Sequence, residues 1–249
     1  MQSINWHLAN CKIRLHFPHF EISNGTYTTD IENTIQHMLQ HFTPEDDPYS
    51  DSEHHRQIRQ LVMKPMDTTD DIELTQEEIF TALHKFDPHK APGEDGLTSE
   101  ILLKTLKFFP EIYNQCLKKG CFPKQWKRSS IIPIIKLGKE ESSDESKYQP
   151  ISFLNKSGKL LEKLLIDRIQ HHLYSNSLMN NNQYGFIPQK STVDAALAAK
   201  NFAEKHLQNK KYIVFKSLAV KGAFDAAWWP SILSNLRDLH CPRNLYCLA

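Results

Sequence analysis

The stretch Val214-Phe-Lys-Ser-Leu-Ala-Val-Lys-Gly-Ala-Phe-Asp-Ala-Ala-Trp-Trp-Pro230 decides how the rest of this sequence is interpreted. Residues 212–220 are rich in β-branched and aromatic side chains, a composition that predicts a β-strand. Because side chains alternate along a strand, Ser217 and Ala219 would share one face of it. The strand leads into residues 221–225, and we expect a helix over residues 230–239.

Five further blocks precede this stretch. They are Lys90-Ala-Pro-Gly-Glu-Asp-Gly-Leu97, Trp126-Lys-Arg-Ser-Ser-Ile-Ile-Pro-Ile-Ile-Lys-Leu-Gly-Lys139, Tyr148-Gln-Pro-Ile-Ser-Phe-Leu154, Gly158-Lys-Leu-Leu-Glu-Lys-Leu-Leu165 and Gln183-Tyr-Gly-Phe-Ile-Pro-Gln-Lys-Ser-Thr192. In composition and order, the six blocks resemble those of reverse transcriptases from non-LTR, LINE-type retrotransposons. The last block of that family reads (V/L)-x-L-D-(V/I)-K-G-A-F-D. The resemblance covers roughly residues 75–249.

This resemblance implies an α+β, helix-rich fold, the right-hand polymerase, of which the chain would contain the fingers and a partial palm. We expect a linker or N-terminal extension over residues 1–74 and a reverse transcriptase domain over 75–249. Within that domain the fingers would span about 75–175 and the incomplete palm about 176–249. The chain ends before the family's catalytic hairpin, so we expect a truncated copy.

Apolar periodicity and capping signals place most of the elements. Thr75-Gln-Glu-Glu78 reads as a capping box that opens a helix through Phe86. Gly120 is expected to end a helix, and Pro133 to mark an edge-type strand. The other expectations are helices over 29–42, 99–108, 111–119, 157–174 and 192–208, a strand over 131–136, a loop over 43–53, a charged hairpin loop over 139–147 and a turn over 180–182.

The same resemblance implies RNA-templated DNA synthesis from dNTPs on a DNA primer, with Mg²⁺ as cofactor. Polymerases of this kind hold two metal ions with carboxylates, and Mg²⁺ prefers hard oxygen ligands. Here Ala219 stands at the position of the metal-binding Asp, and its methyl group offers no lone pair. Asp225 matches a second Asp of the family that does not replace the first. We therefore expect no intact catalytic residue, no metal site and no catalysis by this chain.

Some of the family's nucleotide- and nucleic-acid-binding positions keep their residue type in this sequence, and others do not. Lys136, Gln149, Val220 and Phe224 fall at nucleotide-binding positions, although Gln149 replaces an Arg and loses its charge and fixed donors. Lys136 can equally be a solvated lysine, and Phe224 a core aromatic. We expect nucleic-acid contacts from the cationic positions Lys127, Arg128, Lys159 and Lys190, and simple solvation is the alternative for Lys159.

Whole-chain composition is that of an ordinary globular protein, with a formal net charge of +1. Seven Lys and Arg residues between Lys118 and Lys139, without an acidic residue, indicate a local surface for phosphates. Five cysteines without a CxxC pair, no long apolar run and no signal peptide favour an intracellular protein without a membrane span. His37 and His41 can share a helix face, but no zinc spacing is present. Two other functions remain open, a non-enzymatic nucleic-acid-binding remnant and a transposon relic without a folded function.

Overall fold

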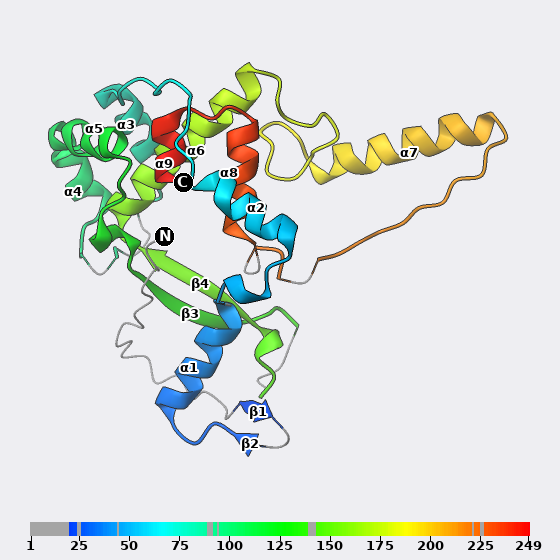
Figure 1. Cartoon of the computed structure of the whole chain (residues 1–249), viewed down its shortest axis with the longest axis horizontal. Helices are drawn as coiled ribbons and strands as arrows, with labels where there is room; N and C mark the ends of the chain where they lie inside the picture. Colours follow the sequence, from blue (N-terminus) through cyan, green and yellow to red (C-terminus); the bar gives the residue numbers. More distant parts are fainter. Residues whose placement is uncertain are drawn as a thin grey trace. The chain divides into compact units, whose positions relative to one another are not determined.

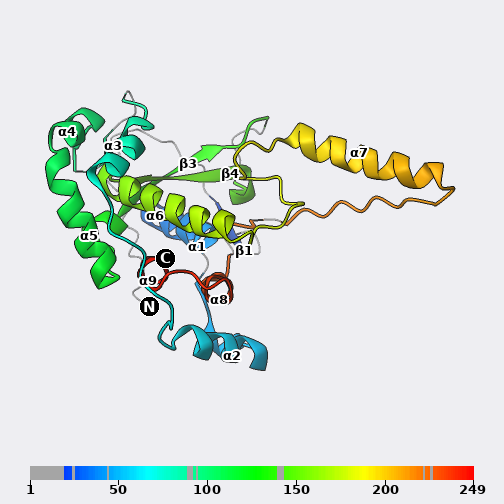
Figure 2. The ribbon, with the colours of Figure 1, turned by 90° about the horizontal axis from the view of Figure 1, so that it is seen from above.

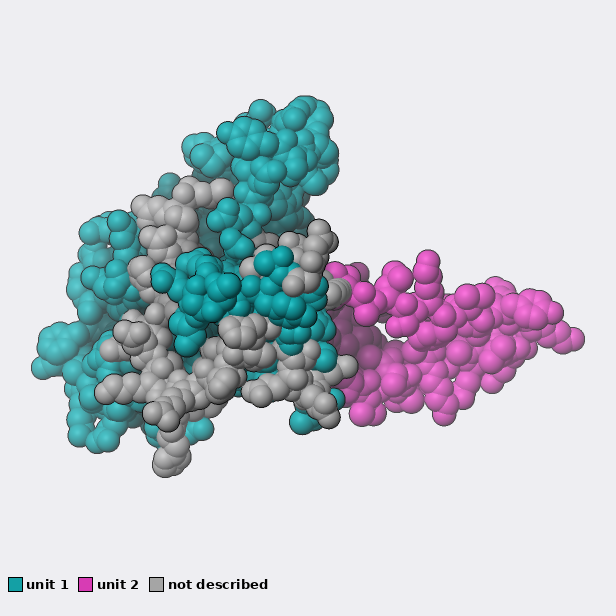
Figure 3. Space-filling model, turned by 90° about the horizontal axis from the view of Figure 1, so that it is seen from below, with its two compact units in different colours: residues 1–170, 224–249 teal, residues 171–223 magenta. Residues whose placement is uncertain are grey.

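The computed structural model describes residues 20–23, 26–43, 45–88, 92–93, 95–138, 143–220, 222–224 and 227–249. The chain forms two compact units, residues 1–170 with 224–249 and residues 171–223, which Figure 3 colours separately. Helices dominate and the described strands are few (Figure 1). The helix-rich α+β class expected from the sequence is therefore confirmed.

The larger unit contains an antiparallel hairpin of β3 (Ser129–Ile135) and β4 (Tyr148–Leu154). Its register places Pro133 opposite Pro150, so both residues that lack an N–H occupy the same rung of the ladder. The predicted strand and hairpin loop are confirmed in kind, although residues 139–142 of the loop lie outside the described residues. A shorter pair, β1 (Glu21–Ser23) and β2 (Thr26–Tyr27), was not predicted.

The main hydrophobic core lies among α3 (Gln76–His84), α4 (Ser99–Lys104), α5 (Phe109–Lys119), α6 (Lys156–Ser175) and α9 (Arg243–Leu248). Figures 1 and 2 show α3, α4 and α5 gathered at the end where α6 begins. The apolar face predicted for the helix over 157–174 supplies Leu160, Leu161, Leu164 and Leu165, all buried. The buried hydroxyl of Tyr113 donates to the Ser157 carbonyl at 2.9 Å and ties α5 to the first turn of α6.

The predicted ends of two helices have clear physical causes. Gly120 follows α5 with φ +56°, the left-handed conformation that favours glycine, and Cys121 N–H reaches back to the Cys116 carbonyl at 3.1 Å. At the start of α3 only half of the predicted capping box forms. The Thr75 hydroxyl accepts from Glu78 N–H at 3.2 Å, but both Glu78 carboxylate oxygens are bound by Arg168 instead.

The first 74 residues hold more structure than the single helix predicted there. The expected helix is α1 (Ile31–Phe42), capped by Asp30, but a short 3₁₀ turn (η1, Pro48–Ser50) and α2 (Glu53–Val62) follow in and after the expected loop. α2 carries no buried residue and is strongly polar on average, but Ile58, Leu61 and Val62 recur at helical spacing after the capping residue Ser52, a signal that the prediction did not use. It lies against α8 (Trp229–Asp238), which fulfils the prediction for residues 230–239.

Residues 64–72 then run beside the C-terminal helices through polar contacts between distant parts of the sequence. Thr68 donates to the Cys241 carbonyl at 2.8 Å, and Arg243 forms an ion pair with Asp70 at 2.6 Å. The Asn244 side chain bridges both backbone groups of Asp71 at 2.9 Å each. The short helix α9 itself was not predicted from the sequence.

The smaller unit contains α7 (Thr192–Gln208), whose bounds are those predicted. Ser191 and Asp194 form a complete capping box at its start. The predicted turn at 180–182 is also present, since Asn182 N–H donates to the Asn180 side chain at 2.9 Å. None of the described residues of this unit is buried.

The strand predicted over residues 212–220 is wrong for this structure. These residues are not part of a sheet, and no described segment pairs with them. A strand depends on hydrogen bonds to a neighbouring backbone, and composition alone cannot supply that neighbour. Tyr212, Val214 and Leu218 consequently leave 80% or more of their surfaces exposed.

Candidate nucleotide and nucleic-acid interface

The β3–β4 hairpin brings two of the predicted nucleotide-binding residues to one end of the sheet. Gln149 lies opposite Ile134, and Lys136 directly follows Ile135, the partner of Tyr148. Both Lys136 and Gln149 are exposed. The Lys136 ammonium donates to the Ser146 carbonyl at 2.7 Å, so its charge is held at the base of the hairpin loop.

One face of the same hairpin is apolar and open. Ile134, Ile151 and Phe153 expose between 37% and 46% of their surfaces on this face. The ammonium of Lys159, from the first turns of α6, lies 5.7 Å from the centre of the Phe153 ring. A cation over an aromatic ring beside exposed apolar side chains combines a phosphate-attracting charge with a flat surface.

The remaining cationic positions of the larger unit lie just before β3. Lys127 ends the 3₁₀ turn η3 (Lys124–Lys127) and is half-buried, and Arg128 is exposed. Two more lysines, Lys118 and Lys119, end α5, where positive charge is favourable at a helix C-terminus.

A buried polar cluster joins the block around Pro92 to the start of α6. A Cβ on Gly93 would lie 2.5 Å from the Asn155 side-chain oxygen, so this backbone approach requires glycine. Next to Asn155, Lys156 is only 4% exposed and donates to the Ser99 hydroxyl at 3.1 Å. Sequence reasoning missed Lys156, because a lysine at a helix start normally indicates solvent. Residues 89–91 and 94 of this block lie outside the described residues.

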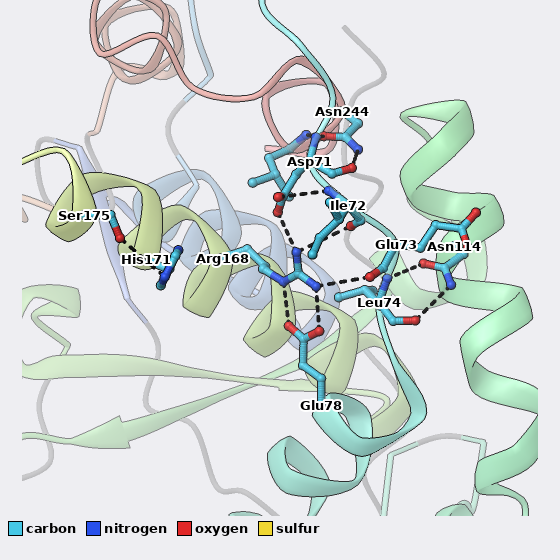
Figure 4. Close-up of polar contacts among 11 residues, drawn as sticks. Asp71, Ile72, Glu73, Leu74, Glu78, Asn114, Arg168, His171, Ser175 and Asn244 are labelled. Carbon is cyan, nitrogen blue, oxygen red and sulfur yellow. Dashed lines mark hydrogen bonds and ion pairs between the residues drawn. The ribbon is translucent and has the colours of Figure 1, made fainter.

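Arg168 fixes the orientation of α6, the helix that carries Lys159. Its guanidinium binds both oxygens of Glu78 at 2.6 Å each and one oxygen of Asp71 at 2.9 Å (Figure 4). It also donates to the carbonyls of Ile72 and Glu73. The Glu78 carboxylate raises the pKa of Arg168 further above its usual value. The sequence analysis did not identify Arg168. In the structure, the Glu78 side chain binds Arg168 instead of completing the capping box at the start of α3.

Two of the predicted residues, Lys190 and Val220, belong to the smaller unit. The Lys190 ammonium donates to the carbonyls of Asn181 and Gln183 at 2.7 and 2.9 Å and lies over the Tyr184 ring. Its charge therefore holds its own loop together. Val220 is exposed, at the end of the unpaired segment.

The donor chemistry around position 219 does not fit Mg²⁺. Ala219 contributes a methyl group, and Ser217, two residues earlier, contributes a neutral hydroxyl. Among the described residues, no three His, Cys, Asp or Glu side chains are grouped so that they could hold a metal ion. Phe224, predicted to be a nucleotide-binding residue, is exposed within the turn 222–224, and Lys221 and Asp225 lie outside the described residues.

Comparison with known proteins identifies the class of protein. Residues 137–248 match the family described as reverse transcriptase (RNA-dependent DNA polymerase). The chain is 32% identical over 235 residues to the RNA-directed DNA polymerase from mobile element jockey of Drosophila melanogaster, an alignment that covers 91% of this chain and 25% of that protein. It is 28% identical over 219 residues to the Retrovirus-related Pol polyprotein from type-1 retrotransposable element R1 of Bradysia coprophila, covering 86% of this chain and 21% of the relative.

A third relative is the probable RNA-directed DNA polymerase from transposon BS of Drosophila melanogaster, 31% identical over 167 residues, with 66% of this chain and 18% of the relative covered. The chain spans a quarter or less of the length of these three proteins. It is a relative of the reverse transcriptases of non-LTR, LINE-type retrotransposons, as its sequence blocks predicted. No helix in the described part of the chain has the length and apolar character needed to cross a membrane.

Proposed function

We propose that this chain is the fingers and the start of the palm of a retrotransposon reverse transcriptase, in a copy that does not catalyse DNA synthesis. The fingers would span about residues 75–175 and the palm would begin near residue 176, with residues 1–74 as an N-terminal extension. The observation that carries the proposal of inactivity is Ala219, at the metal-ligand position of a block that keeps its family pattern from Val220 to Asp225.

The physical reason is one of charge. Phosphoryl transfer depends on positioning and on neutralising the negative charge that spreads over the transferred phosphate. Carboxylate ligands hold the metal ions that provide most of that neutralisation. An alanine methyl cannot replace an anionic oxygen, and the hydroxyl of Ser217 brings no charge. Asp225 and Asp238 are the only acidic residues after Ala219 in this sequence.

The surface for template and nucleotide is better preserved than the metal site. An RNA template, a DNA primer and a dNTP would meet the hairpin end with Lys136 and Gln149 and the cationic positions Lys127, Arg128 and Lys159. Three cations near β3 and α6 suit phosphate contact, which supplies affinity without sequence preference. We do not extend this role to Lys190, whose ammonium already has two carbonyl partners.

Two measurements on the purified chain test the proposal. Primer extension on an RNA template with dNTPs and Mg²⁺ should yield no product above a no-protein control. Extension that EDTA abolishes would show that the chain is active and that position 219 is dispensable.

Binding of an RNA–DNA primer-template, followed by fluorescence anisotropy, should weaken as salt increases. The double substitution K127E/R128E should reduce affinity about tenfold or more at low salt. K200E, on α7, is the matched control and should bind like the unmodified chain. Equal affinity of K127E/R128E and the unmodified chain would remove this surface from the proposed interface.

A further inference from the structure

A histidine pair on α1 faces a single carboxylate in the β3–β4 loop. His37 Nε2 lies 3.7 Å from one oxygen of Glu145, and His41 Nδ1 lies 3.7 Å from the other. The sequence indicated that His37 and His41 share a helix face, but it gave no sign of Glu145, which is more than a hundred residues away. The structure thus gives this pair a partner that the proposed polymerase function does not use.

The distances show two imidazole nitrogens directed at the two oxygens of one carboxylate without a completed hydrogen bond. A separation of 3.7 Å is too long for a hydrogen bond. His37 Nε2 is buried and has no hydrogen-bond partner among the described residues. A buried polar atom without a partner is unfavourable, and a protonated imidazole could direct an N–H from each ring toward Glu145.

The contact between the two histidines and Glu145 lies beside a buried cluster that joins α1 to the β3–β4 hairpin. Phe20, Met38, Phe42 and Tyr148 form a small buried cluster between α1 and β4. The Phe20 ring stacks on His37 with centroids 6.2 Å apart and meets Tyr148 edge-on at 5.5 Å. The two histidines and Glu145 lie beside this cluster, with 18%, 35% and 27% of their side-chain surfaces exposed.

We propose that His37, His41 and Glu145 form a latch between α1 and the β3–β4 loop that strengthens when the histidines are protonated. An imidazole normally changes charge between about pH 5 and 8, within the range of cellular conditions. When both rings are protonated, two imidazolium groups flank one carboxylate and hold α1 against the turn that precedes β4. When neither ring is protonated, this charge attraction is lost and the aromatic cluster is the main contact between the two elements.

Other charged groups on these elements act on the same pair. On the hairpin, the Lys136 ammonium lies on the Ser146 carbonyl, and the Asp144 carboxylate accepts from Ser146 N–H. The described charged groups on the packed elements and their caps, besides the latch itself, are Glu21, Asp30, Glu32, Lys136, Asp144 and Lys147. Carboxylates and ammonium groups ordinarily change charge outside the range of imidazole, so the pH dependence is assigned to the histidines.

Hydrogen exchange of the full chain tests the latch. After correction for the intrinsic exchange rate, protection of α1 amides should be about three- to tenfold greater at pH 5.5 than at pH 7.5. In E145Q, which keeps the shape of the side chain and removes its charge, this ratio should fall to about one. A ratio that persists in E145Q, or a ratio of one in the unmodified chain, would overturn the latch.

Two controls separate the latch from a general effect of pH. H206Q replaces a histidine of α7 and should leave the α1 ratio unchanged. H37Q and H41Q should each lower the ratio, and adding E145Q to the H37Q/H41Q double variant should change it no further. Unchanged protection of α5 in every variant would show that the core is folded. If E145Q weakens α1 by the same factor at both pH values, the contact is a pH-independent packing contact and the proposal fails.

Discussion

At the scale of single residues, Gly120 shows how one position can carry two separate constraints. Its φ of +56° is unfavourable for residues with a Cβ, and a Cβ placed there would lie 2.6 Å from the Cβ of Cys247 in α9. We expect G120A to destabilise the larger unit by about 2–4 kcal/mol, the sum of a left-handed backbone and overpacking. The measurement is the thermal unfolding midpoint together with hydrogen exchange of residues 243–248.

A matched variant isolates the steric part. Gly96 has φ +66°, and a Cβ added to it would meet no described atom within 4 Å, so G96A should cost only about 1 kcal/mol and leave α9 protected. C247G should restore part of the stability of G120A, because it removes the atom that clashes. Equal losses of stability in G120A and G96A would mean that the left-handed backbone conformation alone, without the clash with Cys247, accounts for the glycine at position 120.

At the scale of elements, Arg168 joins α6 to α3 and to residues 71–73. The substitution R168Q leaves Glu78 and Asp71 partly buried without their cation, and we expect a loss of about 2 kcal/mol, below the value for a fully buried pair. Hydrogen exchange should increase in α3 and in residues 71–74. R168K keeps the charge but not the two-pronged geometry, so its exchange should fall between that of R168Q and that of the unmodified chain.

An exposed ion pair provides the comparison. Lys104 and Glu100 of α4 meet at 2.8 Å, but both side chains are about three-quarters exposed. K104Q should therefore leave exchange unchanged throughout the larger unit. If R168Q, like K104Q, left hydrogen exchange unchanged, the Arg168 contacts would not contribute measurably to the packing of α6.

These elements also show what the sequence could and could not predict. Helices α6 and α7 carry their own signals, an apolar face in one and an Ala-rich composition in the other, and both were found within one residue of their bounds. Glu78 appeared to be a capping residue, but a guanidinium ninety residues away binds it more strongly than a backbone N–H would. The strand predicted over residues 212–220 was wrong for a related reason, because a β-strand forms only where a second segment pairs with it.

In the candidate site, too, contacts within one predicted element could be expected from the sequence, whereas contacts that depend on tertiary structure could not. The proximity of Lys136 and Gln149 follows from the hairpin, which the sequence predicted. Lys190 is expected to contact nucleic acid because it is cationic, and that stays a prediction; the bonds of its ammonium to two carbonyls of its own loop could be known only from the folded structure. The contact between His37, His41 and Glu145 depends on tertiary packing between segments that share no sequence signal.

At the scale of the whole molecule, the two units differ in how much of their surface is buried. The larger unit has a main hydrophobic core and a smaller buried cluster, whereas none of the described residues 171–220 and 222–223 is buried. Ordering a residue costs about 1–2 kcal/mol of conformational entropy, and burial is the main term that offsets it. Most helical stability in proteins comes from tertiary packing, which α7 lacks, and an unpaired extended segment has still less to hold it.

Limited proteolysis should therefore act first on the smaller unit. We expect trypsin to cut after Lys210, Lys211 and Lys216 at least ten times faster than after Lys163, which lies in the middle of α6 against the core. Mass spectrometry of early time points identifies the cuts, and K216Q should remove one of them and leave the other two. Resistance of all three sites would show that the backbone of residues 210–216 is protected in solution, by pairing with another segment or with a second copy, because an open and extended lysine is a good substrate for trypsin.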